Sequence, residues 1–70
     1  MTQTVECFSG WKYAERPIAL HWEGQRLEIA AVEAQWLTPE GRHFQVCTRD
    51  NRFFELIYDE YADVWIIKPI

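Results

Sequence analysis

Hydrophobic and polar residues alternate with a period of two along much of the chain, which is the pattern of half-buried β-strands. The alternation is clear in residues 18–22, where Ile18, Leu20 and Trp22 are predicted to share one side of a strand. The short apolar run 5–9 predicts an earlier strand, and the charged segment 10–17 predicts an irregular loop. The pattern therefore indicates an all-β fold.

Turn-forming residues stand singly between the apolar segments. Glu23 and Gly24 resemble the residue pairs that tolerate positive φ, so they predict a two-residue hairpin loop. The sequence Thr-Pro-Glu-Gly at 38–41 predicts a second reversal, because proline suits the second position of a turn and glycine its end. Segments 50–51 and 59–63 close the remaining hairpins. We expect an antiparallel meander of five to six strands.

The segment 26–36 has two interpretations. Leu27 and Ile29 share one strand face, whereas the next large residue, Val32, has the opposite parity. A strand therefore needs a β-bulge or a sharp bend near Ala30 to keep a single buried face. The alternative is an amphipathic helix, because the segment is rich in alanine, glutamate and glutamine, which are good helix formers. We favour the strand.

The C-terminal hairpin is apolar on both faces, and one small core cannot bury both of them. The sheet can cover the second face by curling, or two copies can pack the same patch about a two-fold axis. We expect residues 1–70 to form one domain curled into an SH3-like partial barrel, and we favour a homodimer to cover the second face. One face carries Phe54, Leu56, Tyr58, Trp65 and Ile67, and the other carries Phe53, Ile57, Val64, Ile66 and Ile70, interrupted by Glu55 and Lys68.

Composition narrows the class of protein. With 49% apolar and 16% aromatic residues, the chain is too hydrophobic for a disordered tail. No apolar run approaches the roughly 20 residues that cross a bilayer, so we expect a cytoplasmic protein with no membrane partner. Cys7 and Cys47 lie far apart in apolar contexts, as is usual for buried thiols in a reducing compartment.

The sequence favours neither a metal site nor catalysis. His43 and Cys47 are four residues apart, which on a strand separates them by about 13 Å, too far for one zinc ion. No signature frames Cys47 with His21 or His43 as a nucleophile and base, and we expect His43 to face solvent. We predict no enzyme activity, cofactor or metal. We expect the acidic residues Glu55, Asp59, Glu60 and Asp63 to form a solvated face.

Aromatic residues are more numerous than one thin core can bury, and aromatic side chains are typical of interface centres. We therefore predict a non-catalytic binding or protein-interaction module that binds a protein partner or self-associates. The candidate interaction residues are Trp11, Tyr13, Phe53, Ile57, Val64 and Ile66.

The alternative function is single-stranded nucleic-acid binding, which the net charge of −4 disfavours. In that case aromatic rings would stack on bases while cations follow the phosphates. The stacking residues would be Trp11, Tyr13 and Phe53, and the cations Lys12, Arg16, Arg26, Arg42, Arg49 and Arg52.

Several segments resemble an uncharacterised bacterial family of small domains. The resemblance rests on residues 15–27 (ERPIALHWEGQRL), on Val32 and Trp36, on residues 54–59 (FELIYD) and on Trp65. These are turn glycines, tryptophans and strand residues, so the resemblance implies a β domain without a known activity.

Some relatives in that family occur beside or fused to error-prone DNA polymerase subunits, which implies an accessory role near DNA or its proteins. This chain has Glu23 and Gln25 where those relatives carry arginines in the hairpin. Without these arginines, direct contact of this hairpin with DNA is less favoured.

Overall fold

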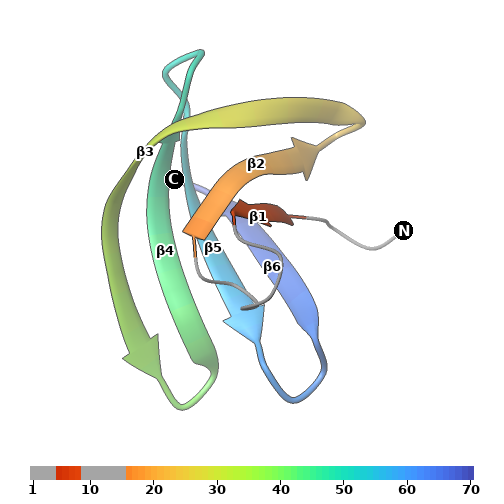
Figure 1. Cartoon of the computed structure of the whole chain (residues 1–70), viewed down its shortest axis with the longest axis vertical. Helices are drawn as coiled ribbons and strands as arrows, with labels where there is room; N and C mark the ends of the chain where they lie inside the picture. The colour runs from red at the N-terminus through yellow and green to blue at the C-terminus, as the bar shows by residue number, and fades with distance from the viewer. Residues whose placement is uncertain (1–4, 9–15) are drawn as a thin grey trace.

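The structure is a computed structural model that describes residues 5–8 and 16–70. Each predicted turn joins two antiparallel strands in it. The strands pair in chain order as a single meander, so the prediction of an all-β fold is confirmed (Figure 1). Most of the predicted loop 10–17 lies outside the described residues. The strands are β1 (Val5–Phe8), β2 (Arg16–Trp22), β3 (Gln25–Thr38), β4 (Gly41–Thr48), β5 (Phe53–Asp59) and β6 (Val64–Pro69).

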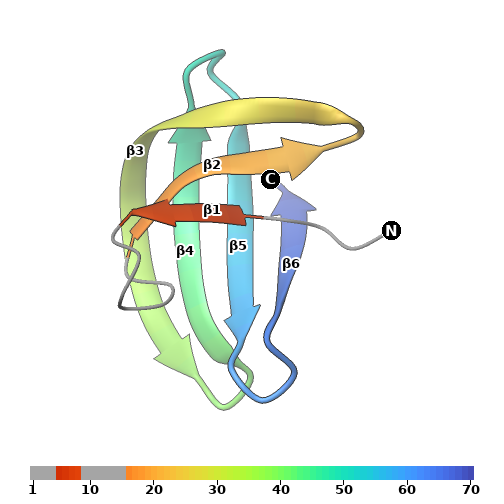
Figure 2. The same ribbon diagram turned by 45° about the vertical axis from the view of Figure 1, so that its right-hand side comes forward.

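The sheet curls over along β3. The first part of β3, up to Glu28, pairs with β2, and the part from Ile29 to Thr38 pairs with β4. The register with β4 shifts at Ala30 and again at Glu33, so β3 carries two bulges. Bulges increase the twist and bend of a strand, and β1 and β2 consequently cross over β4 and β5 as a curled half-barrel (Figure 2). The predicted bend near Ala30 is confirmed, and the helical alternative is wrong.

The inner face of the half-barrel holds the core. Trp22 packs edge-on against Phe54 with ring centroids 5.5 Å apart, and Phe44 lies 5.8 Å from Trp65. The two predicted faces of the C-terminal hairpin are confirmed, since Leu56 and Ile67 point inward. The core consists of Val5, Leu20, Leu27, Phe44, Val46, Phe54, Leu56 and Ile67.

One residue of β2 departs from the prediction. Ile18 is exposed although it shares the strand parity of the fully buried Leu20. The pairing of β2 with β3 ends at Ala19 and Glu28, and β3 then bends away. In the pairing with β1, Glu6 lies opposite Ala19 and Cys7 opposite Pro17, so Ile18 is the extra residue of a β-bulge. The bulge shifts the parity of β2, and Pro17 and Ala19 are buried in place of Ile18.

Glycine is required at one turn. Gly41, at the start of β4, has a φ of 141°, and a Cβ there would collide with the carbonyl oxygen of Tyr58 on β5. The predicted hairpin at Glu23 and Gly24 has φ values of 51° and 80°, as a two-residue turn needs. At Gly24 a Cβ would meet open space.

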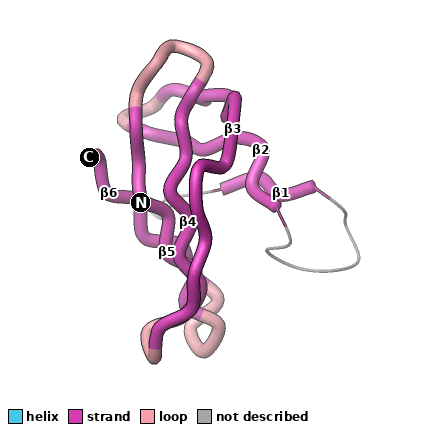
Figure 3. The backbone as a smooth tube through the Cα atoms, turned by 90° about the vertical axis from the view of Figure 1, so that its left-hand side faces the viewer, coloured by secondary structure: helices cyan, strands magenta, loops and turns pink. Residues whose placement is uncertain are grey.

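The turns between β3 and β4 and between β5 and β6 project at the same end of the molecule (Figures 1 and 3). The turn between β4 and β5 projects at the opposite end, beyond the first part of β3. In the part of the chain that the structure describes, we find no helix that is long and apolar enough to cross a membrane.

Candidate functional site

A small cluster of side chains lies on the outer face of the sheet. We call it the outer patch, and it consists of Trp36, His43, Ile57 and Ile66. These residues lie side by side on β3, β4, β5 and β6, in one row across the sheet. The Trp36 ring stacks on the His43 ring at 5.3 Å with an interplanar angle of 19°. His43 is only 6% exposed and Ile57 3% exposed, whereas Trp36 and Ile66 are each 42% exposed.

His43 joins a hydroxyl group to a carboxylate. Its Nδ1 lies 2.7 Å from Glu55 Oε2, and its Nε2 lies 2.7 Å from Thr38 Oγ1. A carboxylate only accepts hydrogen bonds, so Nδ1 donates to Glu55, and Nε2 forms the hydrogen bond with the Thr38 hydroxyl, which can donate or accept. The expectation of a solvent-facing His43 is wrong, because Trp36 covers the ring and both nitrogens have partners.

The order of hydroxyl, imidazole and carboxylate is also that of the hydrolytic triads. Here the Thr38 oxygen also accepts the backbone N–H of Glu40 at 3.2 Å. That bond closes the turn between β3 and β4. The arrangement therefore ties this turn to the sheet through Glu55 on β5.

The acidic residues of the C-terminal hairpin are less solvated than predicted. Glu55 is half-buried beside His43, and Asp63 accepts a hydrogen bond of 2.5 Å from the Tyr58 hydroxyl. Asp59 accepts the backbone N–H groups of Tyr61 and Ala62. Asp59 and Asp63 thus hold the hairpin turn. The prediction of a solvated acidic face is wrong for the half-buried Glu55 and Asp59, whereas Glu60 and Asp63 are exposed.

The structure separates the predicted interaction residues. Phe53 is 44% exposed on the outer face, and Ile66 is exposed there as well. Val64 is half-buried, and Ile57 is covered by its neighbours in the outer patch, so it offers little surface to a partner. A polar row on the same face separates Phe53 from the outer patch. That row consists of Gln45, Glu55 and Lys68, and Trp11 and Tyr13 lie outside the described residues.

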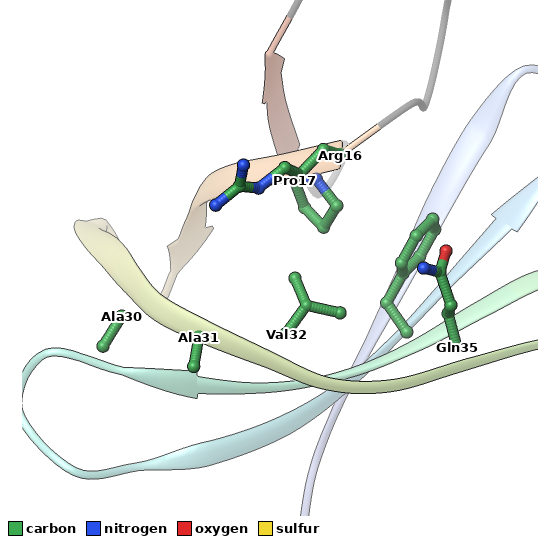
Figure 4. A pocket seen from close by; sticks show the side chains of 7 residues that line it. Arg16, Pro17, Ala30, Ala31, Val32 and Gln35 are labelled. Atoms are coloured by element: carbon green, nitrogen blue, oxygen red, sulfur yellow. The ribbon is translucent and has the colours of Figure 1, made fainter.

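A cavity lies where β2 and β3 diverge. It is an open cleft of about 650 Å³, with Arg16 and Pro17 on one side and β3 on the other. Val32 points from β3 toward Pro17, and Gln35 lies farther along the strand (Figure 4). The remaining described residues of its lining are Ala30, Ala31 and Phe44.

A second cavity of about 280 Å³ adjoins the first, since Gln35 and Phe44 line both. Its lining also includes Leu37 and Arg42, together with Trp36 and His43 of the outer patch. We call the two cavities together the β3 groove. It runs along β3 from the bulge at Ala30 toward the turn between β3 and β4, and its lining includes the β4 residues Arg42, His43 and Phe44.

The arginines are spread over the molecule, and most are neutralised. Arg26 donates to Glu6 from two nitrogens at 2.9 and 3.0 Å, and it also pairs with Glu28. Hydrogen bonds from Arg26 and then from His21 lower the pKa of Glu6 from 4.5 to about 2. Three further ion pairs join Arg42 to Glu60, Arg49 to Glu28 and Arg52 to Asp50.

No group of three potential metal ligands gathers among residues 5–8 and 16–70, and Cys7 and Cys47 are not joined by a disulfide. Comparisons with protein-family models, with curated proteins and with solved structures found no match. The resemblance to the bacterial family therefore stays a prediction.

The β3 groove was not predicted from the sequence. A signal was present in the small residues Ala30 and Ala31, which are adjacent on one strand and line the larger cavity. That signal also suits a helix, and nothing in the local pattern shows which side of β3 lacks a neighbouring strand.

Proposed function

We propose that this protein is a non-catalytic interaction module that binds an extended segment of a partner protein along β3. The observation that carries the proposal is the β3 groove, which lies against a strand edge with no paired strand among the described residues. Such an edge can accept one more strand, a recognition mode in which main-chain hydrogen bonds supply affinity.

The hairpin register indicates which backbone groups face the groove. Thr38 and Gly41 flank a two-residue turn, so they form a hydrogen-bonded pair with each other. Hydrogen-bonded positions alternate along an antiparallel pair. The N–H and C=O groups of Gln35 and Leu37 therefore point away from β4, toward the groove.

The bulges limit how long a bound strand can be. The register of β3 is regular from Ala34 to Thr38 but shifts at Glu33 and Ala30, and such shifts interrupt an edge. We expect a short strand to pair beside Gln35 and Leu37. Its next side chains would then reach the wider cleft, whose lining includes Pro17 and Val32.

The test is selection of binders from a phage-displayed library of random linear peptides, followed by calorimetric titration of the enriched peptides. Gln35→Pro removes the N–H that faces the groove without removing a hydrogen bond to β4. We expect it to weaken peptide binding about tenfold, which corresponds to one or two lost hydrogen bonds.

Gln35→Ala is the matched control, because it shortens the same side chain and keeps the backbone N–H. Circular dichroism and thermal melting check that both variants keep the fold. The proposal is contradicted if no peptide is enriched over an unrelated protein, or if the two variants bind the enriched peptides equally well.

Self-association through the outer face is the second candidate. It is favoured by the exposure of Trp36, Phe53 and Ile66 on one side of the sheet. Light scattering at micromolar concentration tests it, since a mass of 8.4 kDa that does not change on dilution contradicts a dimer. If the mass is doubled, Ile66→Asp is expected to give a monomer and Arg42→Asp is not.

A further inference from the structure

Arg16 differs from the other arginines in its surroundings. Among the described residues, it is the one arginine with no carboxylate within ion-pair distance. It lies on the wall of the larger cavity, at the start of β2 (Figure 4). No described carboxylate therefore neutralises its charge in the larger cavity.

Arg42 adds a second cation with unused hydrogen-bonding capacity. Its Nε lies 3.3 Å from Glu60 Oε2, but the geometry does not make a hydrogen bond, and this buried atom has no acceptor. Arg42 lines the smaller cavity. An unsatisfied buried N–H is costly, so an oxygen acceptor that enters the groove would gain from binding there.

The groove differs from the rest of the molecule in charge. No aspartate or glutamate is among the described residues that line its two cavities, although the chain carries a net charge of −4. Exposed charges farther away are screened over about 8–10 Å at physiological salt. Glu60 lies within this distance of Arg42 and pairs with it, so the positive field in the groove is set mainly by Arg16.

We infer that the segment bound in the β3 groove is acidic, with an aspartate or glutamate side chain held by Arg16. This inference rests on the proposed function and specifies its partner. An arginine and a carboxylate form charge-assisted hydrogen bonds, often two in parallel. The Gln35 amide, which lines the same cavity, offers further N–H donors to a carboxylate or to the bound backbone.

A peptide fits these features better than a nucleic acid does. The groove offers a strand edge and two cations, whereas affinity for nucleic acid depends on many phosphate contacts. Arg26, Arg49 and Arg52, which such a site would also use, are held by carboxylates outside the groove. A fluorescent oligothymidylate is therefore the probe for the other class of ligand.

The experiment compares the peptides that wild type and Arg16→Glu select from the same phage library. Wild type is expected to enrich sequences with an aspartate or glutamate at a fixed position. Arg16→Glu is expected to bind those peptides at least about tenfold more weakly and to enrich lysine or arginine at that position. Arg49→Glu, which changes an exposed arginine outside the groove, is expected to select as wild type does.

The outcomes separate this inference from the proposed function. If no peptide is enriched, the proposed function is contradicted and the inference with it. If peptides bind in a manner sensitive to Gln35→Pro but without an acidic preference, only the inference is overturned. It is also overturned if oligothymidylate binds more tightly than any peptide, or if Arg16→Glu abolishes a wild-type dimer, since the groove would then hold a second copy.

Discussion

The two faces of β4 and β5 bury side chains by different means. On the inner face, Phe44 and Leu56 are covered by apolar groups, including Leu20 and Leu27 from the other layer of the half-barrel. On the outer face, His43 and Ile57 are just as inaccessible, but no second layer of described strands lies over them. They are covered by neighbouring side chains and by the turn between β3 and β4.

This difference shows two sources of burial in one thin sheet. The inner face depends on apolar area removed from water when the sheet folds over, which is the main favourable contribution to folding. The outer face depends on hydrogen bonds between neighbouring strands, which contribute less and require every polar group to have a partner. Substitutions on the two faces should therefore differ in how much they lower the free energy of unfolding. They should also differ in how far that loss depends on a hydrogen-bonding partner.

The largest effect is expected from Phe54→Ala on the inner face. Phe54 is 1% exposed and contacts Trp22, and removal of a buried aromatic ring costs about 3–5 kcal/mol. That cost is similar to the whole stability expected for a domain of this size, so the variant should be largely unfolded in urea titrations. Phe54→Leu provides a milder variant, and Phe53→Ala on the outer face should cost less than about 1 kcal/mol. Equal losses at positions 53 and 54 would contradict the assignment of faces.

The next largest loss of stability is expected from Gly41→Ala, at the turn between β3 and β4. A methyl group there would press on the Tyr58 carbonyl, and φ lies in a region that favours glycine. We expect a loss of about 3 kcal/mol in unfolding free energy. Gly24→Ala has a positive φ but open space, so it should cost only about 1 kcal/mol. Similar costs at the two glycines would show that the approach of Tyr58 is not tight.

A smaller effect isolates the hydrogen bonds of the outer face. A double-mutant cycle with His43→Ala and Glu55→Ala should give a coupling energy of about 1–2 kcal/mol, because the pair is mostly buried. The exposed pair of Arg49 and Glu28 is the control, for which we expect less than about 0.5 kcal/mol. Coupling energies that do not differ would indicate that His43 is buried by packing alone.

The smallest effect on stability is expected from the ion pairs between charged side chains of β1, β2 and β3. Because the pKa of Glu6 is about 2 in the folded chain, below its ordinary 4.5, its ion pairs stabilise the fold above pH 4.5. That contribution is lost as the pH falls toward 2. The difference in Tm between wild type and Glu6→Gln should shrink over this range. Glu33→Gln controls for the loss of one negative charge, and a difference that grows on acidification would contradict the assignment.

The inner face could be predicted from the sequence because its pattern is local. The alternation of Phe54 and Leu56 with Phe53 and Glu55 places each on its face once the turns are known. The parity break at Val32 likewise predicted the bulge near Ala30. Both predictions need only the period of a strand and the rule that one face is buried.

The candidate site could not be predicted in the same way. The burial of His43 depends on Trp36 and Glu55 from two other strands, and a histidine in an alternating strand gives no sign of such neighbours. The β3 groove depends on where the pairing of β2 with β3 stops, which is a property of the bend at Ala30 in three dimensions.

The strand order also has a consequence for how the chain folds. Every pairing in the sheet joins strands that follow each other in the sequence, so each step closes only a short loop at a small cost in entropy. β3 can pair with β2 through Gln25 to Glu28 before β4 has been synthesised, because β4 uses a later part of the same strand. The sheet can therefore grow one hairpin at a time as the chain leaves the ribosome, with each new strand added to an edge that already exists.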